Sequence, residues 1–127
     1  RGKVPSELNN ELAYKVGRTV AGLLKAKKIV IGYDIRKSSP ELAKSLAEGL
    51  TDAGADVINL GMCGTEMIYF GVPHLDADGG AMITASHNPP EYNGLKFVKS
   101  GSRPMGYDSG LDKVEEMILN NQLGEKA

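Results

Sequence analysis

Apolar residues recur at helical spacing near the start of the chain. Between residues 6 and 26 they lie three or four positions apart, which places them on one side of an α-helix, at Leu8, Leu12, Val16, Val20, Leu23 and Leu24. Ser6 follows Pro5 and suits the N-cap position of such a helix. We therefore predict a helix over residues 6–26 that buries one apolar stripe.

Two short runs rich in Val and Ile predict buried strands. They cover residues 28–33 and 56–61, and both are too short for helices. The segment between them carries Leu42, Leu46 and Leu50, again at helical spacing. A strand, a helix and a strand in this order predict a right-handed crossover whose two strands are parallel.

The helix between these strands has recognisable start and stop signals. One reading of its start is a capping box from Ser38 to Glu41. The other places Ser39 at the cap and Pro40 at the first helical position. Gly54 suits the left-handed conformation that ends a helix.

The remaining segments complete an α/β pattern. Residues 65–72 predict a short helix, residues 80–85 a third strand, and residues 95–98 a fourth strand after the turn signal Asn93-Gly94. Because no helix separates the third and fourth strands, we expect them to pair antiparallel. A last helix is predicted to begin within residues 109–112. The fold class is therefore α/β, a three-layer α/β/α domain on a mixed four-stranded sheet with an antiparallel fourth strand.

Composition and charge narrow the class of protein. The 127 residues are too few for two full domains. The longest apolar runs fall far short of the roughly 20 residues that span a bilayer, so no membrane partner is expected. A formal charge of −1 without a basic block argues against nucleic acid. The single Cys63 excludes an internal disulfide and a Cys-based zinc cluster, and it is compatible with a cytoplasmic location.

Sheets of this kind place their chemistry in loops beyond the carboxyl ends of the parallel strands. Three loops qualify, over residues 34–39, 61–66 and 86–93. The last contains a hydroxyl, an imidazole and amides next to the backbone-restricting pair Pro89-Pro90. Adjacent side chains diverge and the Gly-x-Ser-x-Gly elbow is missing, so this loop does not predict a serine hydrolase.

One interpretation of this loop is that Ser86 carries a phosphoryl group. Such a group brings about −1.5 to −2 charges, which require cations nearby. Lys96 lies on the next predicted strand, and Arg1 supplies a guanidinium if the start of the chain is close. A divalent metal ion would neutralise the rest. The alternative is a structural proline-rich loop in which Ser86 is a local cap.

The same residues resemble a known family. Residues 84–96, Thr-Ala-Ser-His-Asn-Pro-Pro-Glu-Tyr-Asn-Gly-Leu-Lys, resemble the phosphoserine loop of the α-D-phosphohexomutases, which interconvert 1- and 6-phosphosugars. Residues 32–42 resemble the second segment of that family, with Tyr33 in place of the usual Arg. Residues 61–70 and 102–104 are most similar to the bacterial phosphomannomutase branch. The resemblance covers residues 1–127 but only the first of the family's four domains, domain I.

The resemblance implies a role for five residues. Ser86 would be the phosphoserine that donates its phosphoryl group to the sugar, recovers another after the bisphosphate intermediate reorients, and binds Mg²⁺ through a phosphate oxygen. The other metal ligands would lie in a domain that this chain lacks. His87 and Asn88 would shape the loop and contact the substrate. Lys96 and Arg1 would contact the phosphosugar, assist proton transfer and balance charge.

The resemblance also implies an activity for the full-length protein. It would be a phosphomannomutase that interconverts mannose 6-phosphate and mannose 1-phosphate, activated by a sugar 1,6-bisphosphate. Phosphoglucomutase and phosphoglucosamine mutase are the alternatives within the family. This domain would pack against the other domains of its own chain and would be inactive alone. A hypothesis of another class is a non-catalytic α/β module for anion binding or assembly.

Three further groups of side chains have a structural interpretation. The cluster of His74, Asp76 and Asp78 fits no known metal-ligand spacing. Asp34 and Arg36 either brace the first loop or form an ordinary surface ion pair. The methionines Met62, Met67 and Met82 are expected in the core.

Overall fold

A mixed β-sheet forms the centre of the computed structural model, which describes residues 2–4, 8–84, 92–99, 103, 104, 116 and 118. Its strand order is β3-β2-β4-β6-β7, with β2 at Lys28–Tyr33, β3 at Asp56–Met62, β4 at Gly79–Ile83, β6 at Leu95–Lys99 and β7 at Arg103–Pro104. Both β3 and β4 pair parallel with β2, and β6 pairs antiparallel with β4. The predicted mixed sheet with its antiparallel fourth strand is confirmed, and β7 extends it at the edge.

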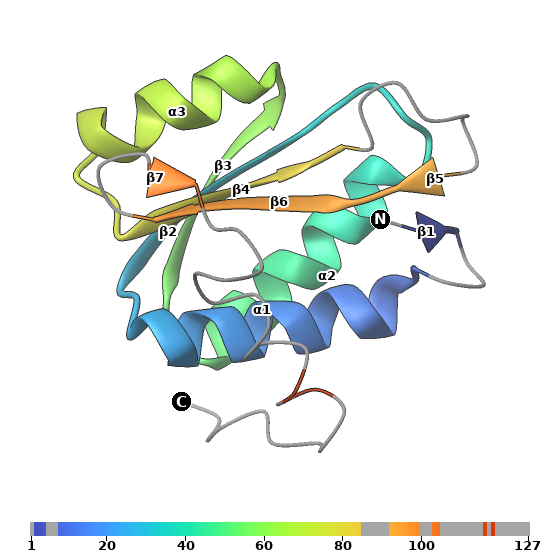
Figure 1. Ribbon diagram of the computed structural model, residues 1–127, viewed down its shortest axis with the longest axis horizontal. Helices are drawn as coiled ribbons and strands as arrows, with labels where there is room; N and C mark the ends of the chain where they lie inside the picture. Colours follow the sequence, from blue (N-terminus) through green and yellow to red (C-terminus); the bar gives the residue numbers. More distant parts are fainter. Residues whose placement is uncertain are drawn as a thin grey trace.

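Helices cover both faces of this sheet (Figure 1). The first face is covered by α1 (Asn10–Leu24) and α2 (Ser39–Asp52), and the second by α3 (Thr65–His74). Each face has its own apolar core, the larger one including Ile31 and Leu46 and the smaller one including Val30, Ile68 and Val72. The three-layer arrangement is therefore the predicted one. Within the described residues, no helix has the length and apolar character needed to cross a membrane.

The first helix begins later than the sequence pattern predicts. Asn9 is its N-cap, and the Asn9 side-chain oxygen accepts a hydrogen bond from the Leu12 N–H at 2.9 Å. Ser6, the predicted cap, lies outside the described residues. Leu8 precedes the helix but is buried in the same core cluster as Ala13, as in a hydrophobic staple. Because Leu8 is apolar and lies just before the Asn9 cap, the apolar pattern predicted a helix start that is too early.

The start of α2 differs from both predicted capping arrangements. Pro40 lies in the first turn, as expected, but Ser38 at the N-cap has helical backbone angles and its side chain makes no capping hydrogen bond. The prediction of a capping box from Ser38 to Glu41 is therefore wrong. At the other end, Gly54 adopts the left-handed conformation predicted for it, with φ +98°.

The contact between α1 and α2 is a backbone contact made by two glycines. A Cβ atom added at Gly17 would lie 2.5 Å from the carbonyl oxygen of Leu46, and one added at Gly49 would overlap the carbonyl oxygen of Tyr14. The Tyr14 hydroxyl also donates to the Asp52 carboxylate and joins the two helices at their polar edge. The helices therefore approach more closely than side chains larger than hydrogen would permit.

Two methionines expected in the core are exposed. Met82 on β4 is 2% exposed, whereas Met62 and Met67 are 60% and 45% exposed. The exposed pair lies at the end of β3 and in the first turn of α3. Of the last predicted helix, the structure describes residues 116 and 118, both helical, and Ile118 packs on the larger core.

Candidate active site

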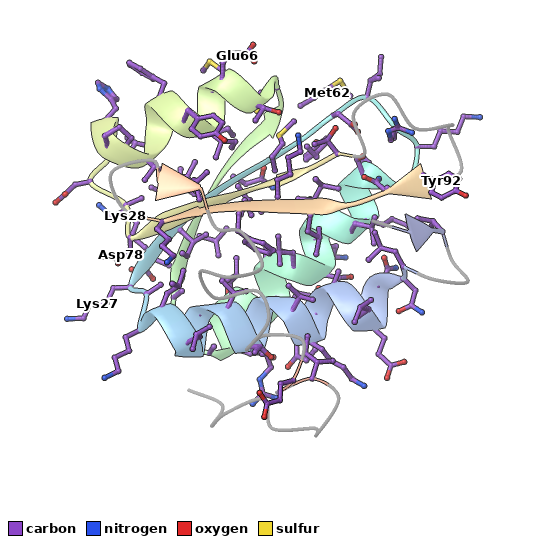
Figure 2. All side chains as sticks on the ribbon, viewed as in Figure 1. Lys27, Lys28, Met62, Glu66, Asp78 and Tyr92 are labelled. Carbon is purple, nitrogen blue, oxygen red and sulfur yellow. The ribbon has the colours of Figure 1, made fainter. Side chains whose placement is uncertain are left out.

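The three predicted loops follow strands that are parallel, so they emerge at one edge of the sheet. β2, β3 and β4 end at Tyr33, Met62 and Ile83. Figure 2 shows Met62 and Tyr92 toward this carboxyl edge and Lys28 and Asp78 at the opposite edge. The sequence thus predicted correctly that these loops share one edge of the sheet.

The residues on either side of segment 85–91 are joined to each other. The Thr84 N–H donates to the Gly94 carbonyl oxygen at 2.9 Å. Just before this point the Asp34 N–H donates to the Ile83 carbonyl at 3.1 Å, which connects the first loop to the end of β4. Ser86, His87 and Asn88 lie outside the described residues. The hydrogen-bonded residues Thr84 and Gly94 therefore flank the segment that contains these three residues.

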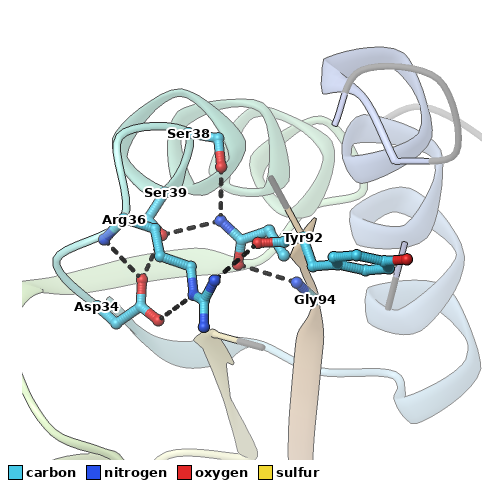
Figure 3. A network of polar contacts seen from close by, with 7 residues as sticks. Asp34, Arg36, Ser38, Ser39, Tyr92 and Gly94 are labelled. Carbon is cyan, nitrogen blue, oxygen red and sulfur yellow. Dashed lines mark hydrogen bonds and ion pairs between the residues drawn. The ribbon is translucent and has the colours of Figure 1, made fainter. Parts of the chain in front are cut away.

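Asn93 follows this segment in the sequence, and its side chain is hydrogen-bonded to Ser38 and Ser39 at the start of α2 (Figure 3). Its side chain is fully buried. The amide nitrogen donates to Ser38 Oγ at 2.8 Å and to Ser39 Oγ at 2.9 Å. The amide oxygen accepts from the Gly94 N–H at 2.9 Å. The two serine hydroxyls that the sequence offered as helix caps therefore bind Asn93.

Asp34 and Arg36 extend the same network toward Tyr92 (Figure 3). The Asp34 carboxylate accepts from the Arg36 N–H at 3.1 Å, from Arg36 Nε at 3.3 Å and from the Ser39 hydroxyl. Arg36 Nη1 donates to the Tyr92 carbonyl oxygen at 3.2 Å. The two charged side chains are only 21% and 12% exposed. They brace the first loop, so of the two predicted alternatives the bracing pair is confirmed.

The substitution Asp34→Asn is expected to make stability less sensitive to acid. Burial by itself raises the pKa of the Asp34 carboxyl, but hydrogen bonds from Ser39, Arg36 and Thr84 and the Arg36 charge outweigh it, so the pKa lies below its ordinary value. A carboxyl with a lowered folded-state pKa stabilises the fold above its unfolded pKa of about 3.9 and loses that contribution as pH falls through the folded value. Urea unfolding from pH 7 to pH 2 should show a steeper loss below about pH 4 for the wild type than for Asp34→Asn. Superimposable pH profiles would contradict this assignment.

Of the two predicted cationic residues, the structure describes Lys96 but not Arg1. Lys96 is exposed on β6 and pairs opposite Met82 near the end of β4, so it lies at the expected end of the sheet. Arg1 lies outside the described residues. However, β1 (Gly2–Lys3) pairs antiparallel with β5 (Tyr92–Asn93), with Gly2 opposite Asn93. This small sheet brings the start of the chain to the loop, and strands of two residues leave no pattern that the sequence analysis could detect.

The described residues do not form a magnesium site. No group of three or more His, Cys, Asp and Glu side chains gathers within them. The Asp34 carboxylate is already bound by Ser39 and Arg36. The predicted ligand, a phosphate on Ser86, belongs to the part of the chain outside the description.

Three other titratable side chains interact with their neighbours within the fold. Burial raises the pKa of the Cys63 thiol, and the nearby Glu66 charge raises it further, which opposes formation of a reactive thiolate. The Asp78 carboxylate accepts the backbone N–H groups of Lys27 and Lys28 at 2.8 and 3.0 Å. These hydrogen bonds hold the pKa of Asp78 below its ordinary value and join the turn before β4 to the start of β2. His74 stacks on Phe70 with ring centroids 4.8 Å apart.

Known proteins are similar to this chain in sequence and in fold. The model of the family "Phosphoglucomutase/phosphomannomutase, alpha/beta/alpha domain I" matches residues 1–125. The Escherichia coli K12 protein named phosphomannomutase is 50% identical over 121 residues, which are 95% of this chain and 26% of that protein. A Klebsiella pneumoniae phosphomannomutase is 47% identical over 122 residues, covering 96% of this chain and 78% of that protein. The chain thus spans about a quarter of the length of its E. coli relative.

A solved structure agrees with these sequence matches. The phosphoglucomutase/phosphomannomutase family protein from Burkholderia thailandensis superposes with a TM-score of 0.88 at 31% identity, covering 99% of this chain and 29% of that one. The names of the bacterial relatives match the predicted resemblance to the phosphomannomutase branch. By its sequence from residue 1 to residue 125 and by its three-layer fold, the chain belongs to the phosphoglucomutase/phosphomannomutase family, as its alpha/beta/alpha domain I.

Proposed function

We propose that this chain is the first domain of a longer phosphomannomutase and that Ser86 carries the phosphoryl group exchanged with the hexose phosphate. The observation that supports this proposal is the bonded pair Thr84 and Gly94 with its bracing network, because it fixes both ends of the short segment that contains Ser86. Phosphoryl transfer depends mainly on positioning and on charge stabilisation. The hydrogen bond between Thr84 and Gly94 supports the first requirement, and the sequence pair Pro89-Pro90 adds to it because proline fixes the backbone φ angle.

The transfer we propose conserves phosphate at each step. The phosphoryl group of Ser86 passes to a free sugar hydroxyl, whose proton leaves to a base while the departing serine oxygen gains a proton, and a sugar 1,6-bisphosphate and a free serine result. The bisphosphate reorients, and its other phosphoryl group passes to the Ser86 oxygen, which loses its proton to a base while the released sugar oxygen gains one, so the isomeric monophosphate leaves. Lys96 and Arg1 are proposed to contact the phosphosugar, balance charge and assist the proton transfers. His87 and Asn88 are proposed to contact the sugar.

The position of Lys96 and that of Gly2, which is next to Arg1 in the sequence, support these roles. Lys96 is exposed at the carboxyl edge. Gly2, the neighbour of Arg1, pairs with Asn93 at the end of the loop. We propose that Mg²⁺ binds the Ser86 phosphate and that its carboxylate ligands come from a later domain, because the described residues offer no such set. We further propose that this domain is inactive without the other domains of its chain, against which it packs. We also propose that the full-length protein is cytoplasmic.

Mass spectrometry of the full-length protein tests the proposal. After incubation with a hexose 1,6-bisphosphate, the peptide that contains Ser86 should gain about 80 Da, the mass of one phosphoryl group. A protein that stays unlabelled at this peptide would contradict the proposal and favour the non-catalytic module. Competition between mannose 6-phosphate and glucose 6-phosphate would then distinguish phosphomannomutase from phosphoglucomutase, and glucosamine 6-phosphate tests the third alternative.

A further inference from the structure

The start of α2 lacks the side-chain capping hydrogen bond that its sequence predicts. A serine at an N-cap usually accepts a backbone N–H of the first helical turn. The Ser38 side chain makes no such bond, and its Oγ accepts from the Asn93 amide instead. Ser39 accepts a second hydrogen bond from the same amide nitrogen. Departures from the locally favoured arrangement are expected at functional sites.

The Asn93 side chain is fixed in one orientation. It is fully buried, both hydrogens of its amide nitrogen have acceptors, and its oxygen accepts from the Gly94 N–H. A satisfied buried network of this kind favours one arrangement over all others. Gly94 in turn accepts from the Thr84 N–H, at the point where the segment with Ser86 begins.

We infer that Asn93 is a positioning residue for phosphoryl transfer at Ser86. It acts through Gly94 and Thr84, the two residues that close the segment, and it is itself held by the two serines at the start of α2. The inference rests on the proposed function. Because a misplacement of about 1 Å can cost about 100-fold in rate, loss of this anchor should appear in the transfer step before it appears in substrate binding.

Two variants and one control test the inference in the full-length protein. Asn93→Ala removes the anchor, and Ser39→Ala removes the hydroxyl that links Asn93 to Asp34 while leaving the bond to Ser38. Asp78→Asn is the control, because it weakens a carboxylate clamp of two backbone N–H groups at the opposite edge of the sheet. For each protein we would measure the rate at which a hexose 1,6-bisphosphate phosphorylates Ser86, together with kcat, KM and Tm.

We expect the phosphorylation rate and kcat to fall about 100-fold in Asn93→Ala and about 10-fold in Ser39→Ala, with KM changed less than about twofold. Asp78→Asn should keep the wild-type rate even where its Tm falls as far. The inference is wrong if both folded variants are phosphorylated at the wild-type rate, or if their rates fall only as the control's does. If Asn93→Ala does not fold, Ser39→Ala decides. A wild-type protein that is not phosphorylated contradicts the proposed function itself, and this inference with it.

Discussion

Gly49→Ala is expected to destabilise the domain by about 3 kcal/mol or more, at the upper end of what overpacking costs. The added Cβ would overlap the carbonyl oxygen of Tyr14 and lie 3.0 Å from the amide nitrogen of Arg18. Both atoms belong to the backbone of α1, so no side-chain rotation relieves the overlap and the two helices must separate. Separation opens the core between them, where Val20 and Leu46 are completely or almost completely buried. Urea unfolding of the chain measures the loss, which corresponds to roughly 10 °C in Tm.

Gly22→Ala is the matched control for this substitution. Gly22 lies in α1 as well, but a Cβ added there meets nothing within 4 Å. Alanine restricts the unfolded chain more than glycine does, so this variant should gain about 0.5–1 kcal/mol. Gly17→Ala should behave like Gly49→Ala, because its added Cβ also meets backbone. Equal stability of Gly22→Ala and Gly49→Ala would show that the helices do not meet through these glycines.

Under the proposed function, Ser86→Ala is expected to lower mutase turnover of the full-length protein by at least about 10³-fold, as removal of a nucleophile does in enzymes that form a covalent intermediate. Alanine has no oxygen that could accept or donate a phosphoryl group. The measurement is the conversion of mannose 1-phosphate to mannose 6-phosphate in the presence of a sugar 1,6-bisphosphate, with Tm recorded in parallel.

Ser45→Ala is a suitable control for this experiment. Ser45 lies within α2, away from the carboxyl edge, so its replacement should leave turnover within about twofold, since alanine also suits a helix interior. If Ser86→Ala turned over as fast as Ser45→Ala, the phosphoryl carrier would have to be another residue and the proposed function would fail in its central step.

Local patterns were sufficient to predict the helices α1, α2 and α3 and the strands β2, β3, β4 and β6, but not the two-residue strands β1, β5 and β7. The β-branched run of β2 is buried at its four central positions, as a strand covered on both faces requires. The boundaries were less predictable, because they depend on packing. Leu8 is apolar and in phase with the stripe of α1, and only its place before the Asn9 cap excludes it from the helix.

The bracing network could not be predicted, because its partners are far apart in the sequence. Asn93 followed by Gly94 is a turn signal in any chain, and two serines before Pro40 are a helix start. Each of these local interpretations is sound by itself. The hydrogen bonds between Asn93 and the serines exist because the parallel pairing of β2 and β4 brings both segments to one edge, and tertiary pairing of this kind has no local signature.

The two-residue strand β1 is expected to have a lower local stability than the strands of the five-stranded sheet. Both β1 and its partner β5 span two residues, whereas β2 is paired along both of its sides. Units with few buried contacts open at a smaller free-energy cost than core strands. Release of Gly2 from Asn93 would leave the five-stranded sheet intact. Amide hydrogens on β1 are therefore expected to exchange with solvent through brief local opening, and those of β2 only when the whole domain unfolds.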